Sequence, residues 1–371
     1  MRLLLTGGGT AGHVNPAIAI AEIFKKNCET AEIAFAGTER GIEHRLVSEA
    51  GYPFFPIEVM GLSRSLSIKN FRALYLALRS PRDAKRILEE FKPSLVVGTG
   101  GYVSWPILSA AARLGIPCAV HESNAAPGLT VRRLAPHVDT VLLNFKEAAE
   151  GLSKKAHTVH VGNPLRRGFA TVSRERARER LGIPQRARVV VSFGGSLGAA
   201  GINAAVLRLF EDYTYKTDDV FHIHGCGTRY YEEYAKTVEV RLGPLPRRIT
   251  VSPYLEKMPE LMAAADLLIC RAGAMTVSEV ARVGRASVLI PSPNVAGDHQ
   301  TKNAKALAEL GAAVLMPEAR SETELSDAVR TLLSDREALA RMEAAARAFD
   351  LPDANRRVYR ELMRLIERSE K

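Results

Sequence analysis

Short apolar runs alternate along the chain with longer stretches of helical pattern. In the first half, helical patterns at 16–26, 41–50 and 104–114 separate the runs LLLTGGG, AEIAFAG, SLVVGTGG, PCAVHES and TVLLNF. A second series repeats the alternation with VVVSFGGSLGA, VFHIHGCG, ITVSPYL, DLLIC, ASVLIP and AAVLMP. Strands alternating with helices predict parallel sheets that are covered by helices. The sequence therefore predicts an α/β protein with two Rossmann-like, doubly wound domains.

The segment 161–166, with the sequence VGNPLR, lies between the two series. Glycine and proline interrupt an extended stretch there, so we place the connection between the domains in this segment. The predicted first domain spans 1–162 and the predicted second domain spans 163–352.

A proline also interrupts the chain before a final helical pattern at 354–369. That pattern has an apolar stripe formed by Val358, Leu362, Leu365 and Ile366. An amphipathic helix buries its apolar face. We expect it to pack on the first domain, which then also includes 353–371.

Composition narrows the class of protein. A length of 371 residues suits two domains, and a hydrophobic content of 46% is typical of a globular enzyme. No apolar run approaches the roughly 20 residues of a membrane helix, and the first strand turns into glycines too soon for a signal peptide, so we expect a cytoplasmic protein. The four cysteines are scattered without CxxC spacing, so we expect neither disulfides nor zinc.

The formal charge of +10 indicates an anionic partner: nucleic acid, an acidic membrane or a phosphorylated substrate. The basic residues are dispersed, and no recognition motif for nucleic acid is present. We therefore expect no nucleic-acid partner.

Three glycine-rich turns follow predicted strands, at 7–12, 98–102 and 194–198. Backbone amides in such turns bind phosphate oxygens, although a tight turn also needs glycine for packing alone. The first turn contains G-x-G-x-x-G, which raises NAD binding as an alternative. Glu39, after the second strand, is an imperfect partner for a ribose. Three such turns favour diphosphate chemistry.

The segment 270–300 combines an apolar strand, a small-residue turn and a helix start. The first amides of that helix, at Ala274, Met275 and Thr276, favour an anion. Glu279 is placed to accept hydrogen bonds from ribose hydroxyls, and Gln300, in the loop GDHQ, to reach a sugar hydroxyl. In the alternative interpretation, Thr276 and Ser278 cap the helix and Glu279 complements its dipole.

His13 follows the first glycine turn. Its ordinary pKa near 6.5 makes it a candidate general base, and the alternative is a structural histidine that caps the loop. Asn124, at another strand end, orients a sugar or stabilises its turn. There is no DxD sequence, so we expect no metal and no other cofactor. Fixed dipoles and Arg166 would then stabilise a leaving diphosphate.

Six motifs in order, GGGTAGHVNP, GTGGYVSWP, HESNAAPGLT, GNPLR, SFGGSLGA and CRAGAMTVSE, resemble the MurG family of bacterial peptidoglycan glycosyltransferases along nearly the whole chain. The resemblance implies a GT-B fold, with two domains facing a cleft. It also implies inverting transfer of N-acetylglucosamine (GlcNAc) from UDP-GlcNAc to the C4 hydroxyl of N-acetylmuramic acid (MurNAc) in lipid I, undecaprenyl-diphospho-MurNAc-pentapeptide. The product is lipid II for peptidoglycan synthesis. Other cell-wall synthesis proteins are further candidate partners.

The resemblance also assigns site residues. On the first-domain side of the donor site it places Thr10, Ala11, Gly12 and Asn124. In the second-domain donor pocket it places Arg166, Ser196, Leu255, Ala274, Met275, Thr276, Val277, Ser278, Glu279 and Gln300. With the donor diphosphate in the second domain, the first two glycine turns are left for the acceptor diphosphate, and we expect Gly9, Gly12, Gly100, Gly101 and Tyr102 there. Ala11 stands where the family commonly has glycine, and its methyl group narrows the space for that diphosphate.

A lipid acceptor gives a meaning to residues 66–79, a helical pattern with two faces. Its apolar face is Phe71, Leu74, Tyr75 and Leu78, and its basic stripe is Lys69, Arg72 and Arg79. This pattern suits an anionic membrane surface, and the alternative is a core-facing helix with snorkelling basic residues. We expect a peripheral protein on the inner face of the cell membrane.

Two rival functions remain. A diacylglycerol glycosyltransferase of the same superfamily would share the donor site and the membrane face without needing the acceptor diphosphate turns. A noncatalytic nucleotide sensor at the membrane would bind UDP-sugar without turnover.

Overall fold

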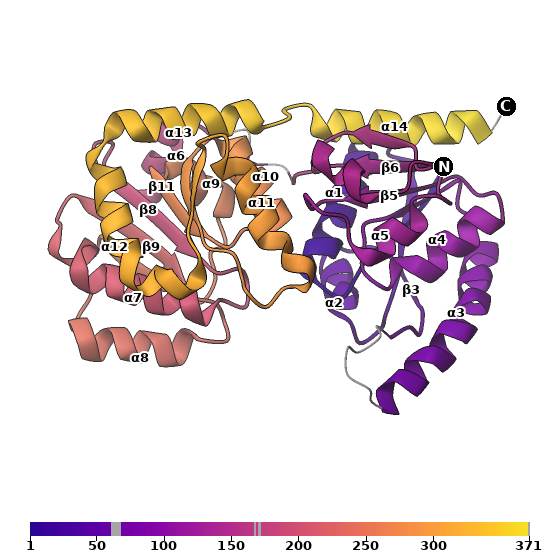
Figure 1. The fold of residues 1–371 in the computed structure, drawn as a ribbon, viewed down its shortest axis with the longest axis horizontal. Helices are drawn as coiled ribbons and strands as arrows, with labels where there is room; N and C mark the ends of the chain where they lie inside the picture. Colours follow the sequence, from indigo (N-terminus) through magenta and orange to yellow (C-terminus); the bar gives the residue numbers. More distant parts are fainter. Residues whose placement is uncertain (61–67, 167, 170–171, 370–371) are drawn as a thin grey trace. The chain divides into compact units, whose positions relative to one another are not determined.

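The computed structural model describes residues 1–60, 68–166, 168–169 and 172–369. The chain forms two compact units, Met1–Arg166 with Leu351–Lys371, and Arg167–Asp350 (Figure 1). The first unit extends to Arg166, whereas we expected a boundary after residue 162. Asn355 explains the difference, because its side chain bonds both the backbone N (3.0 Å) and the carbonyl O (2.9 Å) of Leu165.

The first unit contains a seven-stranded parallel sheet in the order β3-β2-β1-β4-β5-β6-β7. Its strands are β1 (Arg2–Thr6), β2 (Glu32–Gly37), β3 (Phe54–Pro56), β4 (Leu95–Gly98), β5 (Cys118–Glu122), β6 (Thr140–Leu143) and β7 (Thr158–His160). The strand order reverses direction between β1 and β4, so the predicted doubly wound sheet is confirmed. The edge strands β3 and β7 were not predicted, because three residues are too few for a recognisable apolar run.

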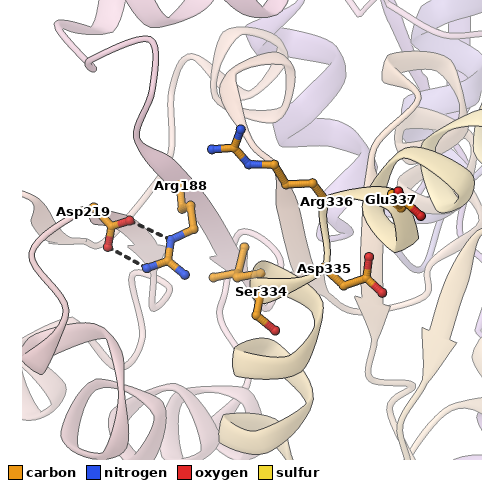
Figure 2. Close-up of a pocket in the computed structure, with 7 residues that line it drawn as sticks. Arg188, Asp219, Ser334, Asp335, Arg336 and Glu337 are labelled. Atoms are coloured by element: carbon orange, nitrogen blue, oxygen red, sulfur yellow. Dashed lines mark hydrogen bonds and ion pairs between the residues drawn. The ribbon is translucent and has the colours of Figure 1, made fainter.

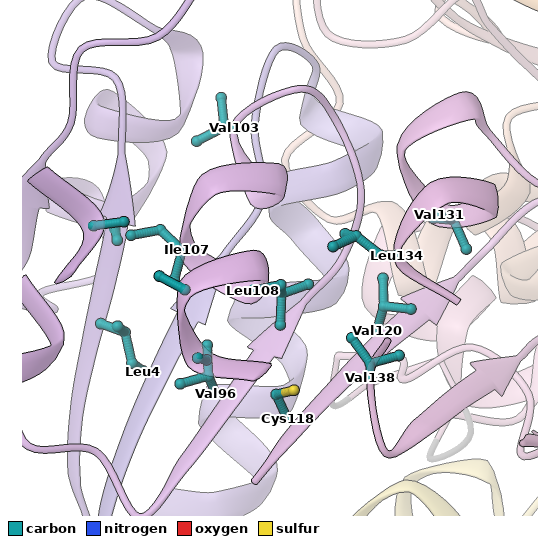
Figure 3. Packing of buried hydrophobic residues seen from close by; sticks show 14 of the residues in the cluster. Leu4, Val96, Val103, Ile107, Leu108, Cys118, Val120, Val131, Leu134 and Val138 are labelled. Atoms are coloured by element: carbon teal, nitrogen blue, oxygen red, sulfur yellow. The ribbon is translucent and has the colours of Figure 1, made fainter. Parts of the chain in front are cut away.

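Helices cover both faces of this sheet: α1 (Ala11–Asn27), α2 (Ile42–Glu49), α3 (Ile68–Phe91), α4 (Ser104–Arg113), α5 (Leu129–Leu134) and α14 (Ala354–Ser369). Successive strand residues point to opposite faces, so a strand that is covered on both sides reads as a continuous apolar run. Leu4 therefore packs with α4 side chains such as Ile107 and Leu108 (Figure 3), while Leu3 and Leu5 pack in a second core.

The C-terminal helix α14 has the predicted bounds and belongs to the second of these cores. Its apolar stripe is buried with α1 residues, and the rings of Tyr359 and Phe24 lie 5.0 Å apart. The predicted return of this helix to the first domain is confirmed.

The predicted start of the first helix, at residue 16, was wrong. Helix α1 begins at Ala11, because Val14 N already bonds Thr10 O at 3.3 Å. Pro16 consequently lies inside the helix. The earlier start brings the first helical turn directly against the glycine turn at residues 7–9.

Helix α3 is longer than the predicted 66–79 pattern. Its C-terminal half packs Ala84, Ile87 and Leu88 into the first core. Arg79 is exposed and lies 3.4 Å from the carboxylate of Asp83. The other side chains proposed for the membrane face lie outside the described side chains: Lys69, Phe71, Arg72, Leu74, Tyr75 and Leu78. No helix in the described part of the chain is long and apolar enough to cross a membrane.

The second unit repeats the architecture with a six-stranded parallel sheet in the order β10-β9-β8-β11-β12-β13. Its strands are β8 (Arg188–Phe193), β9 (Val220–Gly225), β10 (Ile249–Ser252), β11 (Leu267–Cys270), β12 (Ala286–Leu289) and β13 (Ala313–Leu315). Its α-helices are α6 (Arg174–Leu181), α7 (Ala200–Asp212), α8 (Tyr231–Leu242), α9 (Met258–Ala264), α10 (Ala274–Val283), α11 (His299–Ala308), α12 (Glu318–Ser334) and α13 (Arg336–Phe349). The order reverses direction between β8 and β11.

Candidate active site

Two predicted glycine turns meet at the carboxyl edge of the first sheet. They follow β1 and β4, which pair directly and flank the reversal of strand order, where open α/β sheets bind ligands. Gly8 N donates to Gly100 O at 3.4 Å, and Thr99 Oγ1 donates to His13 O at 2.5 Å. A Cβ atom on Gly101 would overlap Gly8 O. Glycine is therefore required here for packing, whatever the turns bind.

His13 lies in the first turn of α1, against the second glycine turn. Its Nδ1 is 3.0 Å from Gly8 O and 3.3 Å from Thr10 Oγ1. A carbonyl oxygen only accepts, so Nδ1 carries the proton and Nε2 is left as an acceptor. Burial lowers the pKa of His13, while the bond to Gly8 O and the charge of Glu43 raise that pKa. A neutral imidazole with an acceptor nitrogen is the form a general base requires.

Asn124 lies at the same edge, in the loop after β5. The buried carboxylate of Glu122 organises this loop, accepting from Asn124 N (2.9 Å), Asn124 Nδ2 (3.0 Å) and Gly128 N (2.8 Å). Sequence reasoning missed Glu122, because nothing local marks a strand-end glutamate as a loop organiser.

Exposed apolar side chains also follow the carboxyl ends of this sheet. Met60 follows β3, Tyr102 and Trp105 follow β4, and Leu129 follows β5. Their exposed fractions run from 36% for Met60 to 64% for Leu129. Exposed apolar side chains thus follow the same strand ends as the glycine turns, and their exposure to water is unfavourable unless another apolar surface covers them.

In the second unit, the turn after β11 leads into the N-terminus of α10. Gly273 is the N-cap and has no side-chain cap, and the first turn holds no acidic residue. The predicted helix start at Ala274 is confirmed. Thr276 and Ser278 lie inside the helix, so neither is its N-cap residue. The N-terminal amides and dipole remain suited to an anion.

Arg271 braces this turn. Its guanidinium donates to Ile290 O (3.2 Å) and Pro291 O (3.1 Å) and forms an ion pair with Glu318. Glu279 lies in the second turn of α10. Burial, and to a smaller extent the charge of Glu279, raise the pKa of Cys270. Arg271 is a further residue that the sequence analysis missed, since its partners come from other elements.

We expected Gln300 in a loop, and this prediction was wrong. It lies in the first turn of α11, where its Oε1 accepts from Ser292 N at 2.8 Å. The helix begins early because Asp298 adopts a left-handed conformation (φ 52°) as its N-cap residue. The side chain thereby ties α11 to the loop after β12.

Ser196 lies exposed in the glycine turn after β8. The turn packs against the one after β9, where a Cβ atom on Gly198 (φ 82°) would overlap Cys226 O. Leu255, by contrast, is buried against Gly225. Arg166 is exposed at the end of the first unit, so its place in a second-domain pocket remains a prediction.

Two buried histidines lie below this turn, on β9. Ser192 Oγ is 2.8 Å from both His222 Nε2 and His224 Nδ1. Burial holds the pKa of His222 well below its usual value and lowers that of His224 to about 3. Both imidazoles are therefore neutral parts of the core.

A hollow of about 570 Å³ in the second unit is unrelated to these turns (Figure 2). Arg188 and Asp219, which line it, pair at the amino ends of β8 and β9, the opposite edge from the glycine turns. Among the described residues, no group of three or more His, Cys, Asp or Glu side chains is placed to hold a metal ion.

Both units are similar to known proteins. Residues 3–143 match the glycosyltransferase family 28 N-terminal domain, and residues 189–358 match the corresponding C-terminal domain. A protein of Acetivibrio thermocellus is 42% identical over 97% of this chain and 96% of its own length, and one of Caldanaerobacter subterraneus subsp. tengcongensis is 40% identical over 97% and 98%. Both are named UDP-N-acetylglucosamine--N-acetylmuramyl-(pentapeptide) pyrophosphoryl-undecaprenol N-acetylglucosamine transferase.

Among solved structures, Acinetobacter baumannii MurG superimposes with a TM-score of 0.78 at 29% identity, covering 98% of this chain and 99% of that one. The similarity in sequence and in fold thus extends over both units. The chain belongs to glycosyltransferase family 28 and, within it, to the MurG family.

Proposed function

We propose that this protein transfers GlcNAc from UDP-GlcNAc to the C4 hydroxyl of MurNAc in lipid I, forming lipid II with inversion at the anomeric carbon. The observation that carries the proposal is the 42% identity, over 97% of the chain, to a relative named for this transfer. The two glycine turns and the acceptor nitrogen of His13 support it, since they suit a diphosphate-bearing acceptor and the removal of a proton.

We assign the donor to the second unit. The amides of residues 274–276 and the turn at 194–198 stabilise charge on the leaving diphosphate, in place of a metal. Glu279 accepts from the ribose hydroxyls, and Ser196 and Gln300 contribute polar groups nearby. Because the Gln300 amide oxygen already accepts from Ser292 N, its amide nitrogen is the group left for a sugar hydroxyl.

We assign the acceptor to the first unit, with its diphosphate on the turns at 7–12 and 98–102. The C4 hydroxyl oxygen attacks the anomeric carbon, the bond from that carbon to UDP breaks, and UDP leaves with the electron pair. His13 Nε2 takes the hydroxyl proton. A single displacement of this kind inverts the configuration.

We further propose that the first unit binds the anionic inner face of the cell membrane. The exposed Met60, Tyr102, Trp105 and Leu129 supply apolar contacts, and exposed basic residues of α3 such as Arg82 and Arg86 supply charge. This attachment would bring the glycine turns to a lipid-linked substrate.

The test incubates the purified protein with a panel of UDP-sugars and either a soluble lipid I analogue or diacylglycerol as the acceptor, and follows the glycosylated product by chromatography and mass. Product from UDP-GlcNAc is expected. Turnover only with diacylglycerol would favour the rival lipid glycosyltransferase. UDP-sugar binding without turnover of any acceptor would favour the noncatalytic sensor.

A further inference from the structure

We propose that Glu43 is a positioning residue for His13, and that it acts through the single peptide group joining Gly8 to Gly9. The inference rests on the proposed function, in which His13 takes the acceptor proton. Glu43 lies in the first turn of α2, away from the glycine turns in sequence, and neither the motifs nor the resemblance pointed to it.

The peptide group between Gly8 and Gly9 has a partner at each end. Its N–H, on Gly9, donates to Glu43 Oε2 at 3.1 Å. Its carbonyl oxygen, on Gly8, accepts from His13 Nδ1 at 3.0 Å. Because resonance couples the N–H and C=O groups of one peptide, an anion on the N–H makes the carbonyl oxygen a stronger acceptor. Carboxylate, peptide and imidazole thus form one polarised chain.

The Glu43 carboxylate is buried and held in place by hydrogen bonds. Glu43 is only 1% exposed, and its Oε1 accepts from Thr38 N at 3.1 Å and from the Thr38 hydroxyl. A buried charge is costly unless it is hydrogen-bonded, and the N-terminus of α2 favours a negative one. In the part of the chain that the structure describes, no Lys or Arg forms an ion pair with Glu43. Its charge is therefore not cancelled locally.

Packing fixes the bridging peptide from both sides. A Cβ atom on Gly8 would overlap the Glu43 carboxylate, and one on Gly101 would overlap Gly8 O. Gly9 has φ 81°, a conformation that favours glycine. The glycines thus allow the carboxylate and the imidazole to approach opposite ends of one peptide group.

The arrangement has two consequences for His13. It holds the proton on Nδ1, so that Nε2 remains the acceptor, and it opposes the effect of burial on the pKa of His13. Glu43, from α2, is the ionisable group whose charge acts on the imidazole, and Tyr102, from the turn after β4, is in turn affected by the charge of Glu43. Burial and the charge of Glu43 both raise the pKa of Tyr102, so Tyr102 stays neutral and Glu43 supplies the charge.

The test compares wild type with Glu43→Gln, which removes the charge and keeps the shape. Two-dimensional ¹⁵N NMR of the histidine side chains, with the His13 signal assigned by its loss in His13→Gln, reports its tautomer and pKa. We expect Glu43→Gln to lower the pKa of His13 and to move the acid limb of the pH–kcat profile to lower pH. We also expect kcat to fall about tenfold, well short of the roughly 10²–10⁴ that a general base supplies, with KM for UDP-GlcNAc unchanged.

The matched control is Val47→Ala, one turn further along α2, which loosens the packing of the helix without changing its charge. An equal fall in the pKa of His13 in this variant would show that Glu43 acts only by holding α2, and would overturn the inference. So would an unchanged pKa and tautomer in Glu43→Gln. If Glu43→Gln does not fold, the tautomer of His13 in the wild-type protein still tests the inference. A proton on Nε2 of neutral His13 would contradict the chain of hydrogen bonds and overturn it.

The proposed function fails separately. If His13→Ala keeps full kcat while Glu43→Gln still lowers the pKa of His13, the link between the two side chains stands and the general base lies elsewhere.

Discussion

The buried histidines of β9 predict that the second unit loses stability in mild acid. His222 and His224 are both fully buried and share Ser192 Oγ. In the native state the pKa of His224 is about 3 and that of His222 is also well below its usual value. In the unfolded chain both return to about 6.5. A native pKa below the unfolded one means that stability is full above pH 6.5 and falls as the pH drops towards the native pKa.

The magnitude follows from the unfolded pKa. At pH 5.0, each unfolded imidazole gains a proton that the native one does not accept. The cost is about 1.4 kcal/mol for each pH unit below 6.5, or about 2 kcal/mol for each histidine at pH 5.0. The pair should therefore remove about 4 kcal/mol from the free energy of unfolding of the second unit between pH 7.5 and pH 5.0. His224→Leu should reduce that loss by about half.

The assay is urea unfolding at pH 7.5 and pH 5.0, followed by circular dichroism. The only tryptophan, Trp105, belongs to the first unit, so its fluorescence identifies the transition of that unit. Phe210→Leu is the control, because Phe210 packs against both imidazoles (centroids 4.8 Å and 6.2 Å away) but does not titrate. It should lower stability equally at both pH values.

One result would refute this reasoning. If His224→Leu lost as much stability between pH 7.5 and pH 5.0 as wild type does, the native imidazole would have to accept a proton as readily as the unfolded one.

Three further predictions concern other parts of the molecule. Leu362→Ala should lower the free energy of unfolding of the first unit by about 3 kcal/mol, because this side chain is fully buried. Arg360→Ala, at an exposed position of the same helix, should change that free energy by less than about 0.5 kcal/mol. Equal effects of the two substitutions in urea titrations would mean that α14 does not pack as described. Glu279→Gln should raise KM for UDP-GlcNAc about tenfold, as expected for a lost charge-assisted hydrogen bond, and an unchanged KM in steady-state kinetics would exclude the ribose role. Gly198→Ala should lower the melting temperature more than Gly182→Ala does. Both glycines have positive φ, but only the Cβ atom added at residue 198 would overlap a neighbouring backbone atom. Similar melting temperatures for the two variants would argue against that contact.

Much of the fold was predictable because its signals are local. Strands covered on both faces must be apolar throughout, so β1, β4, β8 and β11 stand out as apolar runs followed by glycines. The apolar stripe of α14 repeats with helical spacing, and its predicted bounds matched the structure. The edge strands β3 and β7 were missed, because three residues are too few to form a recognisable apolar run. The start of α1 was missed, because Pro16 is typical of a helix start but lies inside this helix.

Some features of the candidate site are likewise visible in the sequence, and others only in the structure. The sequence alone determined the glycine turns, His13 and the helix start at Ala274, because each is a short pattern with a direct physical meaning. Only the tertiary structure decided the roles of Glu43, Glu122 and Arg271. The Glu43 carboxylate accepts from Gly9 N, 34 residues away in the sequence, and Arg271, after β11, pairs with Glu318, the first residue of α12. Such contacts depend on which elements the sheet order places side by side, and no local pattern records that order.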